Sequence, residues 1–294
     1  MRISDTTCDS ESRSKENIVG EWSTTAWQSI VVVAGAPRSG TSWLGQILES
    51  SPRVAYRFQP FFAYASRDRV TVDSTKNEWF EFLQHLYESN DHFLTQEDKR
   101  QSGEYPEFTK DSQPPVLAFK TCRSQYLLPA LLTQFENATL VPIVRHPAAV
   151  IHSWISTPTE FPEGSDVSQE WRFGACKNRG LESEFFGYYK WKELAHMYLD
   201  LHDKFPSRVF PIHYETLVEN TADQVRRLFE FLELPFTSST ESFLANCHKS
   251  HHGSPFAVFK DRSVKDAWRD KLPRSIVDEI QTDLMGTRLE RFIR

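Results

Sequence analysis

The sequence predicts a single α/β domain in which helices flank a central, mainly parallel sheet. Short apolar, β-branched runs alternate along the chain with segments of helical periodicity, and polar motifs begin where three of these runs end. Because ligands gather at the carboxyl ends of parallel strands, we expect the functional site at that edge of the sheet. We expect the domain to cover residues 27–294 and to follow a flexible, polar tail at residues 1–26.

The individual elements are predicted from their periodicity and their boundaries. We expect strands at Ile30–Ala34, Val116–Lys120, Thr139–Val144 and Arg208–His213. We expect helices at Trp43–Glu49, Glu78–Tyr87, Leu127–Phe135, Ala148–Ile155, Phe185–Leu201 and Thr221–Leu232, the last with a capping box between Thr221 and Gln224. Prolines and glycines predict a polar loop at Asp98–Pro115 and an irregular stretch at Ser156–Ser183.

The composition restricts the classes of function. With 39% apolar and 13% aromatic residues, the 294-residue chain can bury a sizeable core, and its net charge of −6 is unlike that of a general nucleic-acid binder. No run approaches the roughly 20 apolar residues of a membrane span, and the N-terminus has no apolar signal core. We therefore expect a soluble, cytoplasmic protein without nucleic-acid or membrane partners; the oligomeric state is left open. The four cysteines form no CxxC pair, which favours free thiols over a metal site.

The strongest local motif follows the first strand, between Gly35 and Ser42. It fits the phosphate-loop pattern G-x-x-x-x-G-K-[ST] at every fixed position but one, where Thr41 replaces the lysine. Gly35 permits a sharp turn, Gly40 lets backbone N–H groups approach an anion, and the next helix directs its N-terminal dipole there. The alternative is an ordinary strand–turn–helix with a surface arginine, Arg38. Without the lysine and an acidic Mg²⁺ ligand, a nucleoside triphosphatase is disfavoured.

A second motif closes the third expected strand and opens a helix. Arg145 supplies a permanently charged fork that matches a phosphate, and Pro147 suits a helix start. Ser153 follows about two turns later, a spacing that can return its hydroxyl to the phosphate side of the helix. The alternative is a surface arginine before a helix, with Ser153 packed elsewhere.

These motifs resemble those of sulfotransferases that use 3′-phosphoadenosine 5′-phosphosulfate (PAPS). The string from Ala36 to Trp43, APRSGTSW, resembles the family's 5′-phosphosulfate loop, and Arg145-x-Pro147 with Ser153 resembles its 3′-phosphate motif. Further resemblances, in the same order as in the family, are Phe119-Lys120-Thr121-Cys122-Arg123 with Leu127-Leu128-Pro129, Tyr214-Glu215-Thr216-Leu217 with Leu234-Pro235-Phe236, and Trp268-Arg269. Pro52–Pro60 leans toward the carbohydrate and tyrosylprotein branches. The resemblance spans about residues 30–292 and implies a P-loop-like α/β fold.

The resemblance also implies roles for individual residues. PAPS would be the co-substrate, and its chemistry requires no metal. Arg38 and Lys120 would stabilise the charge that builds on the bridging oxygen as an acceptor attacks sulfur in line. The 5′-phosphosulfate would be held by Arg38, Ser39, Gly40, Thr41, Ser42 and Trp43, the 3′-phosphate by Arg145, Ser153 and Arg262, and the adenine would lie near Tyr214.

The general base is where this chain departs from the family. Cytosolic members use a histidine where this chain has Cys122, and the carbohydrate and tyrosylprotein members use a glutamate where it has Gln59. Glutamine accepts no proton usefully, and the thiol would need a lowered pKa. Three explanations stay open: another base, an acceptor that needs little deprotonation, or binding without turnover. Other candidate bases are His152, His251, His252 and Glu184.

The acceptor is expected to be a small molecule or a sugar. Aromatic residues that could line its pocket are Phe58, Phe61, Phe62 and Tyr64, although core packing is an equal alternative. The acids Glu160, Glu163, Asp166 and Glu170 would suit a cationic acceptor or simply form a solvated loop. Competing functions are a small-molecule kinase with a degenerate phosphate loop and a non-catalytic nucleotide-binding protein.

Overall fold

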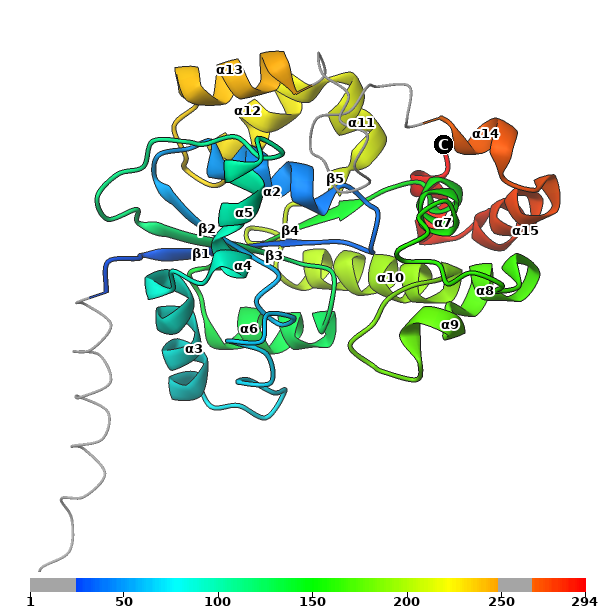
Figure 1. Cartoon of the computed structure of the whole chain (residues 1–294), viewed down its shortest axis with the longest axis horizontal. Helices are drawn as coiled ribbons and strands as arrows, with labels where there is room; N and C mark the ends of the chain where they lie inside the picture. Colours follow the sequence, from blue (N-terminus) through cyan, green and yellow to red (C-terminus); the bar gives the residue numbers. More distant parts are fainter. Residues whose placement is uncertain (1–24, 248–265) are drawn as a thin grey trace, which may run out of the picture.

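The computed structural model describes residues 25–247 and 266–294, and it centres on one five-stranded sheet (Figure 1). All strand pairs are parallel, and the strand order is β2-β3-β1-β4-β5. The strands are β1 (Ser29–Ala34), β2 (Val54–Phe58), β3 (Val116–Thr121), β4 (Ala138–Val144) and β5 (Ile212–His213). The predicted α/β class with a parallel sheet is therefore confirmed.

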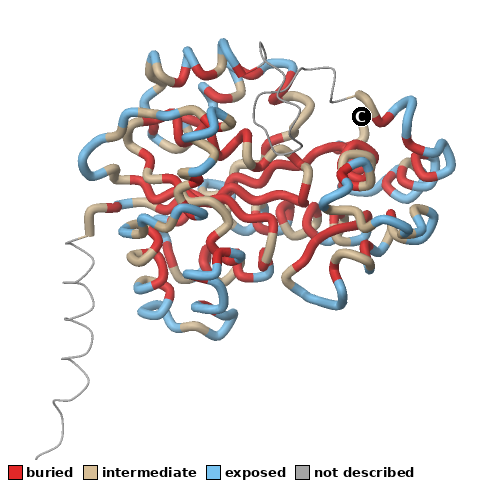
Figure 2. The backbone as a smooth tube through the Cα atoms, in the orientation of Figure 1, coloured by how far each residue is buried: buried red, intermediate tan, exposed pale blue. Residues whose placement is uncertain are grey.

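The central strand β1 separates two hydrophobic cores, one on each face of the sheet. Because side chains alternate along a strand, Ile30 and Val32 pack into one core and Val31 and Val33 into the other. All four side chains are at most 3% exposed, and Figure 2 shows the strands as a continuous buried layer between helices. Because both faces of β1 are buried, residues 30–34 contain no polar side chain.

Helices cover both faces, and a third group lies beyond the carboxyl ends of the strands (Figure 1). The first core contains α3 (Lys76–Glu88), α6 (Leu128–Gln134) and α10 (Tyr188–Lys204); the second contains α2 (Thr41–Glu49), α11 (Tyr214–Glu219), α12 (Thr221–Phe231) and α13 (Ser238–Asn246). Beyond the strand ends lie α7 (Pro147–Ile155), α8 (Val167–Phe173), α9 (Ala175–Asn178), α14 (Trp268–Lys271) and α15 (Arg274–Leu284). Short helices α4 (His92–Thr95) and α5 (Glu97–Gln101) and 3₁₀ turns at Gln125–Leu127 and Arg288–Phe292 complete the described chain.

Several predictions of local structure were wrong. Strand β2 was not expected. The start of the predicted polar loop at Asp98–Pro115 belongs to α5, and the stretch expected to be irregular contains α8 and α9. The predicted capping box is absent: Asn220 is the N-cap of α12, and the Thr221 hydroxyl donates to the carbonyl of Val218 at 3.3 Å. A capping box occurs instead at the start of α3, between Thr75 and Glu78.

The chain enters the domain just before β1. Trp27 is 2% exposed and donates from Nε1 to Gln84 on α3 at 2.9 Å. Residues 1–24, most of the predicted tail, lie outside the described residues, so the boundary stays a prediction. Across residues 25–247 and 266–294, none of the helices combines the length and the apolar character that a membrane crossing requires.

Candidate functional site

The loop between β1 and α2 is shaped by glycines that have no room for a side chain. Gly40, the N-cap of α2, has a φ of 96°, and a Cβ there would lie 2.7 Å from Tyr214 Cε2. At Gly35 a Cβ would lie 2.8 Å from the carbonyl oxygen of Ile143 on β4. Arg38 also has a left-handed backbone, with a φ of 74°. The loop therefore packs closely against β4 and α11.

This loop leaves polar groups for a ligand. No side chain caps the N-terminus of α2, where backbone N–H groups lack intrahelical partners. Ser39 is fully buried, and its hydroxyl has no hydrogen-bond partner within the described part of the chain. Thr41 is buried and Ser42 half-buried in the first turn of α2. These donors suit an anion, since a helix N-terminus attracts negative charge.

The structure brings the two predicted phosphate motifs together. Arg38 Nε donates to Ser153 Oγ at 3.2 Å, and Arg145 Nη1 donates to the Arg38 carbonyl at 3.0 Å. Burial is the main cause that lowers the pKa of Arg38, and the neighbouring charge of Arg145 lowers it further. Two arginines at such close range need a counter-charge. Part of it comes from Glu160, whose Oε2 lies 3.5 Å from Arg38 Nη1.

Tyr214 joins the two motifs from the start of α11. Its ring lies 4.7 Å from the Arg145 guanidinium carbon and meets Trp43 edge-on at a centroid distance of 6.2 Å. The same ring packs over Gly40. The tyrosine that was expected near the adenine therefore contacts residues of both predicted phosphate sites.

The backbone around Arg145 is fixed by contacts with two tryptophans, Trp191 and Trp268. The Arg145 carbonyl accepts a hydrogen bond from Trp191 Nε1 at 3.0 Å. The next residue, His146, stacks on Trp268 at 4.3 Å and accepts the Ala148 N–H at Nδ1, which caps α7. Burial, aided by the nearby positive charge of Arg269, lowers the pKa of His146 to about 3. This histidine is therefore neutral at physiological pH.

Lys120 and Cys122 extend the site along β3. Lys120 is 4% exposed; its Nζ lies 3.8 Å from Cys122 Sγ and 4.2 Å from the centroid of the Phe58 ring. Burial lowers the pKa of Lys120. Cys122 Sγ lies 3.1 Å from Thr41 Oγ1, and the Cys122 N–H donates to Gln59 Oε1 at 3.0 Å. Both residues at the family's base positions are thus tied into structural contacts.

The other candidate bases lie in different surroundings. Glu184 pairs with Arg123 at 2.9 Å, and burial raises the pKa of its carboxyl. His152 lies on α7, and burial lowers its pKa. His251, His252 and the predicted phosphate ligand Arg262 lie outside the described residues.

The predicted acceptor aromatics fall into three groups. Phe61 belongs to the core, where it stacks on Phe82 at 5.6 Å, whereas Tyr64 is 85% exposed. Phe58 and Phe62 both contact Phe93 on α4, and Phe62 also lies under the Arg123 guanidinium at 4.1 Å. Of these aromatics, Phe58 contacts Lys120. Among the residues that the structure describes, no three His, Cys, Asp or Glu side chains are arranged to hold a metal ion.

Comparison with known sequences identifies the family. The model of the sulfotransferase family matches residues 30–238, which include Arg38, Lys120, Arg145, Ser153 and Tyr214. The chain therefore belongs to the sulfotransferase family. It is also 24% identical over 271 residues to cytosolic sulfotransferase 12 of Arabidopsis thaliana, an alignment that covers 87% of this chain and 76% of that protein.

Solved structures support the same fold. Mouse sulfotransferase SULT7A1 in complex with PAP (adenosine 3′,5′-bisphosphate) is 14% identical and superposes with a TM-score of 0.52, over 96% of this chain and 94% of that one. A retinol dehydratase in complex with retinol and PAP is 13% identical, with a TM-score of 0.51, over 91% and 84% of the two chains. At these identities the likeness concerns the fold.

Proposed function

We propose that this chain transfers the sulfuryl group of PAPS to a hydroxyl or nitrogen of a small-molecule acceptor, natural-product-like or sugar. The observation that carries this proposal is the junction of the two motifs: Arg38 lies within hydrogen-bond distance of Ser153 and Arg145, although it precedes both by more than 100 residues. Membership of the sulfotransferase family supports it, as do the PAP complexes of two proteins with the same fold.

The donor site would be formed by residues of three strand ends. Ser39, the N–H groups of Gly40 and Thr41, and the side chains of Ser42 and Arg38 would bind the 5′ end. Their fit rests on the buried, unsatisfied Ser39 hydroxyl and on the uncapped N-terminus of α2. Arg145, Ser153 and, as a continuing prediction, Arg262 would bind the 3′-phosphate, while Trp43 and Tyr214 would border the nucleotide.

In transfer, PAPS supplies an activated sulfuryl group with PAP as the leaving group. Arg38 and Lys120 would stabilise the charge that grows on the bridging oxygen, because both are cations held in a largely buried site. No step in this scheme calls for a metal. Phe58, Phe62 and Phe93 next to Lys120 would border the acceptor and exclude water from the reacting atoms.

Calorimetric titration with PAP, adenosine 5′-monophosphate and Mg²⁺-ATP tests the donor site. We expect PAP to bind at least 100-fold more tightly than the monophosphate, and Arg145→Ala to remove most of that preference, since a charged hydrogen-bonded contact is worth about 3 kcal/mol or more. Equal or tighter binding of Mg²⁺-ATP would favour the degenerate kinase instead. A protein that binds PAP normally but never consumes PAPS would be the non-catalytic homologue.

A further inference from the structure

Glu160 forms an ion pair with Arg38, one of the two predicted phosphate-binding arginines, although the sequence placed it only in an acidic loop. It follows α7, and its backbone is fixed at both ends of the residue. The Glu160 N–H donates to the Thr157 carbonyl at 2.9 Å, and its carbonyl accepts from Trp154 Nε1 at 3.2 Å. The adjacent Phe161 packs edge-on against Trp154. A rigid turn therefore holds the Glu160 side chain towards Arg38.

The Glu160 carboxylate has unused capacity to accept a proton or a hydrogen bond. Its side chain is 17% exposed, and Oε2 is buried 3.5 Å from Arg38 Nη1 without a hydrogen-bond partner in the described part of the chain. Its charge also reaches Lys120, because it partly offsets the burial that lowers the pKa of that lysine. Glu160 thus pairs with Arg38 and acts electrostatically on Lys120, the two cations expected at the reacting sulfuryl group.

The other candidate bases near Arg38 contact groups other than this arginine. Gln59 Oε1 accepts the Cys122 N–H, and the Cys122 thiol lies between Thr41 and Lys120. Glu184 pairs with Arg123 through Oε1; its Oε2 also lacks a hydrogen-bond partner among the described residues, but its ion-pair partner is Arg123 and not Arg38. Among the candidate bases within the described residues, Glu160 alone combines proximity to Arg38 with an unsatisfied oxygen.

We propose that Glu160 is the general base for sulfuryl transfer and that, until the donor binds, its carboxylate stays paired with Arg38. This inference rests on the proposed function. The 5′-phosphosulfate competes with Glu160 for Arg38, so donor binding releases the carboxylate on the acceptor side. Glu160 then takes the proton of the acceptor O–H or N–H as the acceptor's lone pair forms the new bond to sulfur. The bond from sulfur to the bridging oxygen breaks, PAP leaves with that electron pair, and Glu160 later gives the proton to solvent.

Donor affinity provides a test that needs no acceptor. PAP is titrated calorimetrically into the wild type, Glu160→Gln and Glu163→Gln, the last being an exposed glutamate of the same loop. Because the amide no longer competes for Arg38, we expect Glu160→Gln to bind PAP three- to tenfold more tightly, and Glu163→Gln to stay within twofold of the wild type. Unchanged or weaker PAP binding by Glu160→Gln would overturn the competition.

The proton transfer is tested with acceptor probes of different acidity. PAP release from PAPS is measured with water, benzyl alcohol and 4-nitrophenol for the wild type, Glu160→Gln, Glu160→Asp and Glu184→Gln. Loss of a base typically costs 10²- to 10⁴-fold, so we expect Glu160→Gln to lower kcat about 100-fold with water and benzyl alcohol. With the acidic phenol we expect a loss below tenfold. Glu160→Asp should recover at least a tenth of the wild-type rate.

The outcomes separate this inference from the proposed function. Equal losses for all three acceptors, or a larger loss in Glu184→Gln, would overturn the assignment of Glu160 while wild-type turnover upheld the sulfotransferase. A wild type that binds PAP but releases none from PAPS with any probe would overturn both the base and the catalytic part of the proposed function. Failure to bind PAP would reject the donor site itself.

Discussion

The two ends of helix α2 differ in how their polar groups are satisfied. At the N-terminal end, the buried Ser39 hydroxyl has no hydrogen-bond partner within residues 25–247 and 266–294, and Gly40 offers no side-chain cap. At the C-terminal end, buried Glu49 pairs with Arg100 at 2.6 Å and accepts a hydrogen bond from Gln46 at 2.7 Å. The same nine-residue helix thus has one open and one closed end.

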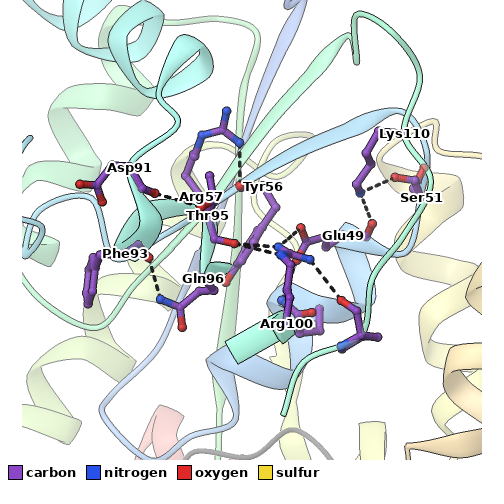
Figure 3. A network of polar contacts seen from close by, with 12 residues as sticks. Glu49, Ser51, Tyr56, Arg57, Asp91, Phe93, Thr95, Gln96, Arg100 and Lys110 are labelled. Atoms are coloured by element: carbon purple, nitrogen blue, oxygen red, sulfur yellow. Dashed lines mark hydrogen bonds and ion pairs between the residues drawn. The ribbon is translucent and has the colours of Figure 1, made fainter. Parts of the chain in front are cut away.

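Figure 3 shows the closed end. Lys110 Nζ donates to the carbonyls of Glu49 and Ser51, the latter at 3.1 Å, and a cation at a helix C-terminus is favourable. Arg100 also donates to the carbonyl of Thr95, which ties α4 to α2. Burial lowers the pKa of Lys110 to about 8. The network thus pairs the buried charge of Glu49 and caps the end of the helix.

The comparison shows how a binding site can be separated from a structural cluster. Both ends contain buried charged or polar side chains, so burial alone does not distinguish them. Unsatisfied polar atoms occur at both ends, since Gln46 Oε1 and Ser51 Oγ lack partners among the described residues just as Ser39 Oγ does. What differs is that the buried charge at the closed end is paired with Arg100, whereas the open end is an uncapped helix N-terminus, which attracts an anion.

The largest expected effect comes from breaking the closed end. Arg100→Leu leaves the Glu49 carboxylate, 4% exposed in its side chain, without its cation. Removing one partner of a buried ion pair typically costs about 3–5 kcal/mol, so we expect the free energy of unfolding in urea to fall by about that amount. PAP affinity of the folded protein should stay within twofold.

A matched surface pair provides the control. Arg226→Leu removes an ion pair with Glu241 in which both side chains are more than half exposed, and its loss should be within about 1 kcal/mol. If Arg100→Leu instead weakened PAP binding tenfold or more, the two ends of α2 would not be independent.

An intermediate effect is expected from acid, through His146 behind the open end. Its folded-state pKa of about 3 lies below its unfolded value near 6.5, so the folded protein binds fewer protons between these values. The stability from this residue is present above pH 6.5 and is lost as pH falls toward 3. Between pH 6.5 and 5 the loss is about 2 kcal/mol.

Urea unfolding at both pH values measures this contribution. His146→Asn keeps an N-cap residue but has no titrating ring. We therefore expect the free energy of unfolding of this variant to fall by about 2 kcal/mol less than that of the wild type between pH 6.5 and 5. The exposed His92→Asn serves as the control and should leave the pH dependence of the wild type intact. Equal slopes for all three proteins would contradict the prediction.

The smallest and sharpest test compares two serines that flank α2. Ser39 and Ser50 are both fully buried, but the Ser50 hydroxyl donates to the Ile47 carbonyl at 2.6 Å and lies within hydrogen-bond distance of the Thr240 hydroxyl at 2.8 Å, from which it can accept. We expect Ser50→Ala to cost about 1 kcal/mol of stability and to leave PAP affinity unchanged. Ser39→Ala should leave stability within about 0.5 kcal/mol and weaken PAP binding roughly fivefold. The reverse pattern would contradict the assignment of open and closed ends.

The sequence predicted the central elements of the fold because their patterns are strong. Strands β1, β3 and β4 are largely buried on both faces, and most of their residues are apolar. Strand β2 was missed because Arg57 interrupts a five-residue run at the edge of the sheet. The arginine fits there because its guanidinium donates to the carbonyls of Leu86 and Tyr87 at the end of α3, a contact between distant segments that no local pattern reveals.

Much of the candidate site was predictable because its residues follow strand ends. Arg38, Lys120 and Arg145 lie at the ends of three neighbouring strands, and the topology brings them together. Glu160 follows a helix instead, so its approach to Arg38 depends on the path of a loop. Only three-dimensional packing, here that of Phe161 against Trp154, fixes such a path.

The position of β1 at the centre of the sheet has a consequence for protein synthesis. The strand that leads into the phosphate loop is made first, yet its neighbours β3 and β4 begin about 85 and 110 residues later, and Tyr214 follows Gly40 by more than 170. While the ribosome is still translating, this apolar strand has no neighbours with which to pair. The proposed nucleotide site can therefore form only after more than 170 further residues have followed the phosphate loop, so PAP would not assist the early, co-translational folding of that loop.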